Sequence, residues 1–366
     1  MNQDFMRTKP ILPLVLSMAL PMMLSMLINS LYNIVDSMFV ARLGEQALTA
    51  VSLVYPLQTL IVSIGVGFGV GINAAVAFFM GAGEKEKADR AASQGLFLSL
   101  VHGILLSVGT VICIPYFLPM FTADNLILAW GKEYAVIVLS FSVVVTVQIA
   151  FEKIYQSTGN MFVPMVCMAA GSITNIVLDP VFIFGLGPVP RLEVKGAAIA
   201  TAIGQVVTLL LYLIWYFKKD MGLSIKRTYM KPTADICRRV YMVGVPCSMT
   251  MGLPSLLITI LNGFAAAFSP IYILILGVYF KLQSFIYLPA NGIVQGMRPI
   301  LSYNYGADER KRMKRIIQIC GAMILAIMAV GMLLFLVFSG SIMKMFTVDA
   351  VTVREGALAL RIISFG

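Results

Sequence analysis

Residues 71–90 read GINAAVAFFMGAGEKEKADR, and residues 296–315, 225 positions later, read GMRPILSYNYGADERKRMKR. The two stretches share glycine, alanine, glutamate and arginine at matching positions without a gap. The same shift aligns Leu57, Gln58, Ile61 and Gly67 with Leu282, Gln283, Ile286 and Gly292, and Pro21 with Pro246. An internal repeat constrains architecture more strongly than a single motif does. The sequence therefore predicts two homologous halves.

The composition places these halves in a membrane. Hydrophobic residues make up 59% of the 366 positions, charged residues only 12%, and the mean hydropathy is +0.91. A soluble domain is nearer half apolar and a quarter charged. Apolar stretches predict about ten membrane-spanning helices. They lie near residues 11–40, 47–80, 91–117, 133–156, 160–186, 196–217, 239–268, 272–304, 316–339 and from about 355 onward.

The repeat also predicts how the halves are oriented. Six spans separate equivalent points, and an even number means that both halves enter the membrane in the same direction, as a parallel repeat about the membrane normal. We expect an all-α polytopic fold with a six-helix lobe over residues 1–217, a basic cytoplasmic linker over 218–238, and a second lobe over 239–366. Since residue 366 corresponds to residue 141, the second lobe should hold about four of six helices, and the full protein twelve spans. Two facing lobes favour an alternating-access transporter over a channel.

The net charge of +10 reports topology rather than nucleic-acid binding. Eighteen of the 27 Lys and Arg residues fall in the N-terminus and alternate predicted loops: Arg7, Lys9, Lys85, Lys87, Arg90, Lys153, and the runs at 218–239 and 310–315. Basic residues accumulate on the cytoplasmic side of membrane proteins. We therefore expect a multi-pass protein of the cytoplasmic membrane, with a cytoplasmic N-terminus and the lipid bilayer as its surroundings.

The sequence indicates neither an enzyme nor a metal site. The five cysteines show no metal-ligand spacing, and His102, the only histidine, has no Cys, Asp or Glu at ligand spacing. No nucleophile and base pair is evident for hydrolysis. The glycine run at 65–71 lies inside an apolar span, where small residues allow close helix packing and phosphate binding is not expected. We expect no cofactor.

Two acids fall inside predicted spans of the first lobe, where ionisable groups are costly. Asp36 lies six residues before the outer loop at Arg42 and Asp179 eight before Gly187, so both carboxyls lie about 9–12 Å below the outer surface. Tyr32 and Asn175, each four residues before an acid, and Thr201 in the sixth span share this level. We predict that Asp36, Asp179, Tyr32, Asn175 and Thr201 form a site where two carboxyls compete for one proton and release it when a cation arrives. The alternative is that each acid bonds a local backbone group or lies at the aqueous edge.

Two further residues inside spans have open interpretations. Pro21 removes a backbone donor from the first span, which makes it either a moving hinge or a static kink. Lys281 in the eighth span either lines a cavity, joins an ion pair or extends toward the membrane surface.

These segments resemble the MATE family, the multidrug and toxic compound extrusion transporters. The resemblance rests on NSLYNIVDSMFVARLG at 29–44, NIVLDPVFI from Asn175, GAAIATAIGQ from Gly196, and the two repeated stretches quoted above. It implies export of organic cations and lipophilic drugs, coupled to inward flow of H⁺ or Na⁺. By position, it assigns ion coupling to the five residues of the predicted site, a bend to Pro21, and a weaker cavity role to Gln148.

One departure separates this chain from part of that family. The branch typified by NorM has an acid in its seventh helix, whereas residues 239–268 contain no Asp or Glu. The chain is more similar to the branch with Asp-Pro in the fifth helix, at Asp179-Pro180. We expect a monomeric antiporter of H⁺ or Na⁺ with lipophilic cations. The alternatives are a flippase for lipid-linked saccharides, which would prefer a cationic cavity, and a non-transporting scaffold or receptor, which would not require two buried acids.

Overall fold

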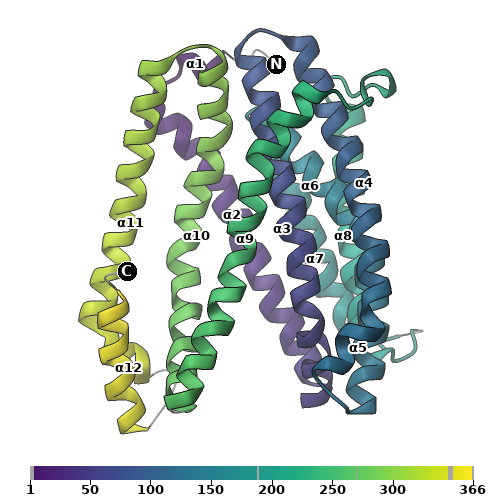
Figure 1. Cartoon of the computed structure of the whole chain (residues 1–366), viewed down its shortest axis with the longest axis vertical. Coiled ribbons are helices and arrows are strands. Elements are labelled where there is room, and N and C mark those ends of the chain that lie inside the picture. The colour runs from purple at the N-terminus through teal and green to yellow at the C-terminus, as the bar shows by residue number, and fades with distance from the viewer. Residues whose placement is uncertain (1–3, 188, 269, 345–348, 365–366) are drawn as a thin grey trace.

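The computed structural model describes residues 4–187, 189–268, 270–344 and 349–364, and helices are the only regular structure among them (Figure 1). The short α1 (Phe5–Thr8) and the 3₁₀ turns at Leu118–Met120 and Arg227–Tyr229 accompany eleven longer helices. These are α2 (Ile11–Ala41), α3 (Glu45–Gly81), α4 (Lys85–Phe117), α5 (Asn125–Ser140), α6 (Ser142–Ser157), α7 (Phe162–Phe184), α8 (Glu193–Lys218), α9 (Ala234–Phe268), α10 (Pro270–Gly306), α11 (Arg310–Lys344) and α12 (Ala350–Ile363).

Six helices are long and apolar enough to cross a membrane on their own: α2, α3, α4, α7, α8 and α11. Helices α5 and α6 together form a further span, bent by 42°. The all-α polytopic architecture predicted from composition is confirmed, although the search covers only the described residues.

The sequence predicts one helix over 133–156, whereas the chain forms two helices that meet at Phe141 and together make one bent span. Serine side chains explain the break. The Ser142 hydroxyl donates to the Leu139 carbonyl (2.5 Å), and the Ser107 hydroxyl of α4 donates to the Ser140 carbonyl (3.0 Å). Side chains that occupy backbone carbonyls in this way bend helices.

The helices form two groups that touch at one end of the molecule (Figure 1). Helices α2–α8 make the first lobe and α9–α12 the second, with α3 packed on α9 and α10, and α2 packed on α10. The lobes meet at the end that carries the N-terminus, which we call the closed end, and diverge toward the opposite, open end. At the closed end Arg7 pairs with Glu309 (2.6 Å), and the Asn304 amide donates to the Met6 carbonyl (3.1 Å), tying the N-terminal segment to the second lobe.

Glycines of α3 and α10 make the contact between the lobes, and they do so reciprocally. A methyl group at Gly81 would overlap the carbonyl oxygen of Tyr303, and one at Gly306 would overlap that of Phe78. The repeat shift relates Gly81 to Gly306 and Phe78 to Tyr303. These two contacts are therefore exchanged by a two-fold axis between the lobes.

Two more pairs of contacts obey the same relation. Gly67 touches Ser248 and Gly71 touches Gly244, while Gly292 touches Met23 and Gly296 touches Ala19. The repeat shift of 225 residues converts the Gly67–Ser248 contact into the Gly292–Met23 contact, and the Gly71–Gly244 contact into the Gly296–Ala19 contact. Such reciprocity identifies a parallel repeat with its axis between the lobes, as the sequence predicts.

We predict that Gly306→Ala lowers the free energy of unfolding by about 1–3 kcal/mol, because the added methyl group meets backbone that cannot move aside. Gly321→Ala in α11 is the matched control, since a methyl group there meets open space and should raise stability by roughly 0.5–1 kcal/mol. Thermal unfolding in detergent compares the two. Equal stability of both variants would contradict the proposed close approach.

Candidate functional site

The five predicted coupling residues converge in the first lobe from three helices. Helix α2 carries Tyr32 and Asp36, α7 carries Asn175 and Asp179, and α8 carries Thr201. Asp179, Asn175 and Thr201 are 0%, 2% and 4% exposed, whereas Tyr32 and Asp36 are partly exposed. We call these five residues the acid site.

Direct contacts hold the acid site together. The Asn175 amide donates to Asp179 Oδ1 (3.4 Å) and to Thr201 Oγ1 (3.3 Å). The Tyr32 hydroxyl also lies near Thr201, and the Asp36 and Asp179 carboxyls interact with each other where α2 packs against α7. The structure thus joins residues that are 143 positions apart in sequence, while their role in ion coupling stays a prediction.

The acid site is short of donors. Among the described residues, Asp36 Oδ1, Asp179 Oδ2 and Asn175 Oδ1 are buried without a hydrogen-bond partner. A buried acceptor without a donor is costly, so such groups attract a proton, a water molecule or a cation. Two carboxyls in contact also repel each other when both are charged, and binding of one positive charge relieves the repulsion.

Two neighbours of the acid site were not anticipated. Tyr134 of α5, 3% exposed, lies near Asp36 and Tyr32 and interacts with the Gln58 side chain on α3. Gln58 carried a signal, because it is one of the polar residues that the repeat preserves, at Gln283. Tyr134 is one tyrosine among many in apolar segments, and only the path of α5 brings it to the acids.

An acid outside the membrane-spanning segments positions α5. Asp124 caps this helix, accepting from the backbone N–H groups of Leu126 (2.8 Å) and Ile127 (3.3 Å), while the Gln46 side chain donates to its other oxygen (3.0 Å). These hydrogen bonds favour the charged form and hold the pKa of Asp124 below its usual value, the backbone bonds first and Gln46 after them.

The remaining predicted residues have different outcomes. Gln148 lies on α6 with its amide oxygen buried and unpartnered among the described residues. The side chain of Lys281 lies outside what the structure describes. Pro21 lies within α2, which continues as a helix from Ile11 to Ala41, and its carbonyl accepts from the Ser25 hydroxyl (2.9 Å). Its role as a moving hinge stays a prediction.

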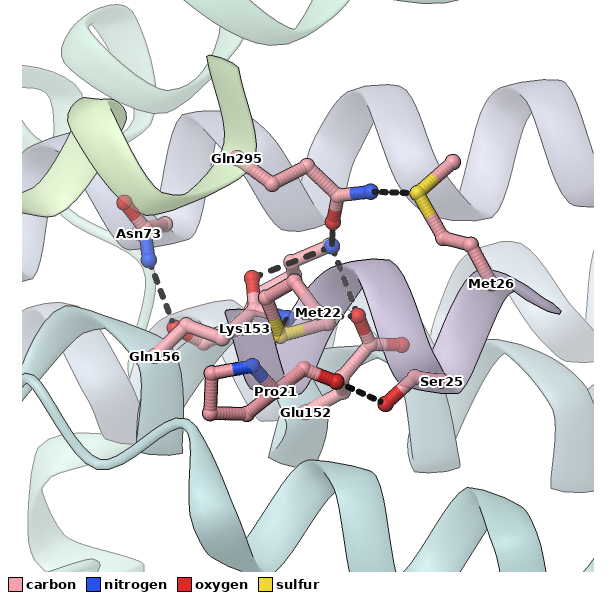
Figure 2. Close-up of polar contacts among 9 residues, drawn as sticks. All are labelled: Pro21, Met22, Ser25, Met26, Asn73, Glu152, Lys153, Gln156 and Gln295. Carbon is pink, nitrogen blue, oxygen red and sulfur yellow. Dashed lines mark hydrogen bonds and ion pairs between the residues drawn. The ribbon is translucent and has the colours of Figure 1, made fainter. Parts of the chain in front are cut away.

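The assignment of Lys153 to a cytoplasmic loop is wrong. Lys153 lies in α6 and is 3% exposed, and its ammonium group pairs with Glu152, which is 9% exposed, at 2.7 Å (Figure 2). The error arose because a glutamate and a lysine adjacent in sequence resemble the charged edge of a span. A buried pair needs further polar partners, and here they are Gln156 on the same helix and Gln295 on α10.

The chain belongs to the MatE family of membrane transporters, whose model matches residues 21–181 and 246–366. The two matched segments begin at Pro21 and Pro246, the prolines that the repeat aligns. The chain is similar to the multidrug export protein MepA of Staphylococcus saprophyticus, with 27% identity over 336 residues, covering 91% of this chain and 73% of that protein.

Two solved structures share the fold at 26% identity. One is an outward-facing conformation of a multidrug resistance MATE family transporter of the MOP superfamily, with a TM-score of 0.90 over 99% of this chain and 80% of that one. The other is a MOP superfamily transporter from Pyrococcus furiosus, with a TM-score of 0.89 over 98% and 79%, whose binding pocket of reverse polarity suggests a different function.

We predict that the Asp124 cap loses its stabilising effect in acid. The pKa of Asp124 is lower in the folded protein than in the unfolded chain. Its contribution to the free energy of unfolding is therefore complete above the unfolded-state pKa of about 3.9, and it disappears as the pH falls through the folded-state pKa. Asp124→Ala should therefore unfold at a lower temperature than wild type at pH 7, with the difference shrinking below about pH 4. Glu133→Ala, an exposed position on the same helix, is the control. A difference that persists unchanged at low pH would contradict the cap.

Proposed function

We propose that this protein exports lipophilic organic cations across the cytoplasmic membrane in exchange for H⁺ or Na⁺, by alternating access between its two lobes. The acid site would bind the coupling ion, and the space between the lobes would bind the substrate. Membership in a transporter family and similarity to a multidrug export protein support the class of activity. The coupling ion, the antiport and the monomeric state are part of the proposal.

One observation carries it: two carboxyl groups in contact, with buried oxygens that lack donors among the described residues. This arrangement needs one positive charge. A proton satisfies it by letting one acid donate to the other, and Na⁺ satisfies it by accepting oxygen ligands from the two aspartates and Asn175. Either ion would compete with a second cation for the same negative charge, which is the basis of exchange.

The arrangement of the lobes supports a direction. With a cytoplasmic N-terminus, as the positive-inside pattern predicts, the closed end faces the cytoplasm and the open end the outside. The chain would then be outward-open, in keeping with its similarity to the outward-facing transporter. In this state Asp36 and Tyr32, which are partly exposed, would be accessible to external H⁺ or Na⁺.

The polarity of the acid site argues against a flippase for lipid-linked saccharides. Such a protein has to receive a phosphate, and two carboxylates would repel it. The described groups around the acid site are tyrosines, amides and a hydroxyl, with no lysine or arginine among its contacts in the described part of the chain. A cationic substrate fits these surroundings.

The test is transport of ethidium by the protein in proteoliposomes, driven by a pH gradient alone or a Na⁺ gradient alone. We expect Asp36→Asn and Asp179→Asn to reduce transport to background under the gradient that drives wild type, because each removes a charge that the ion must balance. Asp235→Asn, an exposed aspartate at the start of α9, should transport normally. No wild-type transport under either gradient would overturn the proposal and favour the flippase.

Tyr134→Phe tests whether the unanticipated neighbour takes part. Removing its hydroxyl takes a polar neighbour from Gln58 and from the acids, and we expect the transport rate to fall roughly two- to tenfold, the effect of one hydrogen bond. Tyr116→Phe, at a tyrosine that is 77% exposed, is the matched control. Equal rates in both variants would remove Tyr134 from the site.

A further inference from the structure

The buried pair found in α6 is the centre of a network that reaches the second lobe (Figure 2). The Lys153 ammonium group donates to Glu152 Oε1 (2.7 Å), Gln156 Oε1 (3.1 Å) and Gln295 Oε1 (3.0 Å), which uses all three of its donors. Gln295 lies on α10 and the other three on α6. We call Glu152, Lys153, Gln156 and Gln295 the polar latch.

The polar latch also contacts α2 just after Pro21. The Gln156 amide donates to Glu152 Oε1 (2.7 Å) and to the Met22 sulfur (3.4 Å), and the Gln295 amide donates to the Met26 sulfur (3.3 Å). Met22 and Met26 lie one turn apart, one and five residues beyond the proline (Figure 2). One cluster thus joins α2, α6 and α10, and any rotation of α2 about Pro21 would move both methionines.

The surrounding backbone is built to accept Lys153. A methyl group at Gly69 of α3 would lie 2.7 Å from Lys153 Cγ, so only a glycine leaves room for the lysine side chain to pass. The Asn73 amide donates to the Lys153 carbonyl (3.0 Å) and fixes the position of this turn of α6. Both residues face α6, and they alternate along α3 with Gly67 and Gly71, which contact α9.

Burial of this pair has an energetic consequence. Removing two charges from water costs free energy, and well-packed apolar residues in the same place often stabilise a protein more. Here the burial depends on the second lobe, because Gln295 supplies the third partner of Lys153. If the closed end separates, Gln295 leaves and water reaches the charges. The free-energy cost of burying the pair is therefore present when the lobes touch at the closed end, and it is absent when they separate.

We propose that the polar latch sets the equilibrium between two forms of the protein: a shut form, in which the lobes touch at the closed end, and an open form, in which they are separated there. Lys153 and Glu152 act as positioning residues: the intact latch holds the lobes together through Gln295, while the charge of the pair keeps this contact weak enough to break. The inference rests on the proposed alternating access, since it assigns the groups whose contact changes when the lobes separate.

The latch makes predictions of opposite sign. Lys153→Met leaves the Glu152 charge without its partner while the end is shut, so it should raise the ratio of open to shut forms roughly tenfold or more. Gln295→Leu should act in the same direction, because it removes the bond across the lobes. The double variant Glu152→Leu with Lys153→Met also loses the bond to Gln295, but it replaces both buried charges by apolar groups. Because removing a buried charge pair stabilises by more than one hydrogen bond contributes, this variant should lower the ratio. Gln283→Leu, in the same helix with partners Tyr279 and Tyr287 four residues away on either side, should leave it unchanged.

The experiment is pulsed electron–electron double resonance, which measures the distance between two spin labels. The labels are placed at positions 85 and 311, which are exposed sites at the closed end of α4 and α11. Labels on unnatural amino acids leave the five native cysteines in place. The distributions are recorded for wild type and the four variants, with and without ethidium, and thermal unfolding is measured in parallel. The opposite shifts of the single and double variants, with an unchanged Gln283→Leu, are the expected result.

The outcomes separate the two proposals. If wild type shows two label–label distances, and the ratio of the open to the shut form is the same in every variant, the latch is overturned while alternating access stays in place. Lower unfolding temperatures in the single variants without a change in ratio would show that the pair only supports the first lobe, which also overturns the latch. A single, unchanging distance in all proteins and conditions would overturn both proposals.

Discussion

The close approach of two lobes through glycine is the constraint on which the rest of the structure depends. Three pairs of contacts, exchanged by the repeat, bring α3 and α10 close to their neighbours over the half of each helix nearer the closed end. Side chains larger than hydrogen at Gly81 or Gly306 would hold the lobes apart there. Because these contacts lie in the half of each helix nearer the closed end, the helices diverge toward the other end (Figure 1). Tyr32 and Asp36 of the acid site lie on the part of α2 nearer that open end, and both are partly exposed.

The first lobe holds two clusters of ionisable groups that differ in charge balance. In the acid site two carboxyls face each other among amides and hydroxyls, and the described contacts supply no cation. In the polar latch one carboxylate is neutralised by one ammonium whose donors are all used. A site that lacks a charge can bind an ion from outside, whereas a balanced one can only exchange internal partners. This difference in charge balance is why we propose ion binding for the acid site and control of the lobe contact for the polar latch.

Much of the acid site could be predicted because helical spacing is local. Tyr32 precedes Asp36, and Asn175 precedes Asp179, by four residues, so each pair shares a helix face in any helical fold. The common depth of the two acids followed from counting residues to the loops. Tyr134 could not be predicted in this way, because a bend separates α5 from α6. At the bend the hydroxyl groups of Ser142 and of Ser107, which lies on α4, donate to backbone carbonyl groups of α5. The direction of α5, and hence the place of Tyr134, follows from that bend.

By itself the sequence determined the membrane-spanning helical class, the duplicated lobes and the level of the two acids, because composition, repeat spacing and helical periodicity are properties of the chain alone. The tertiary structure alone decided the environment of Glu152 and Lys153. Adjacent opposite charges near the end of a span read as a solvated edge, and only the arrival of Gln295, 142 positions later, together with the space left by Gly69, makes burial of the lysine possible. Whether a charge is buried depends on partners that pack against it, and local sequence does not specify them.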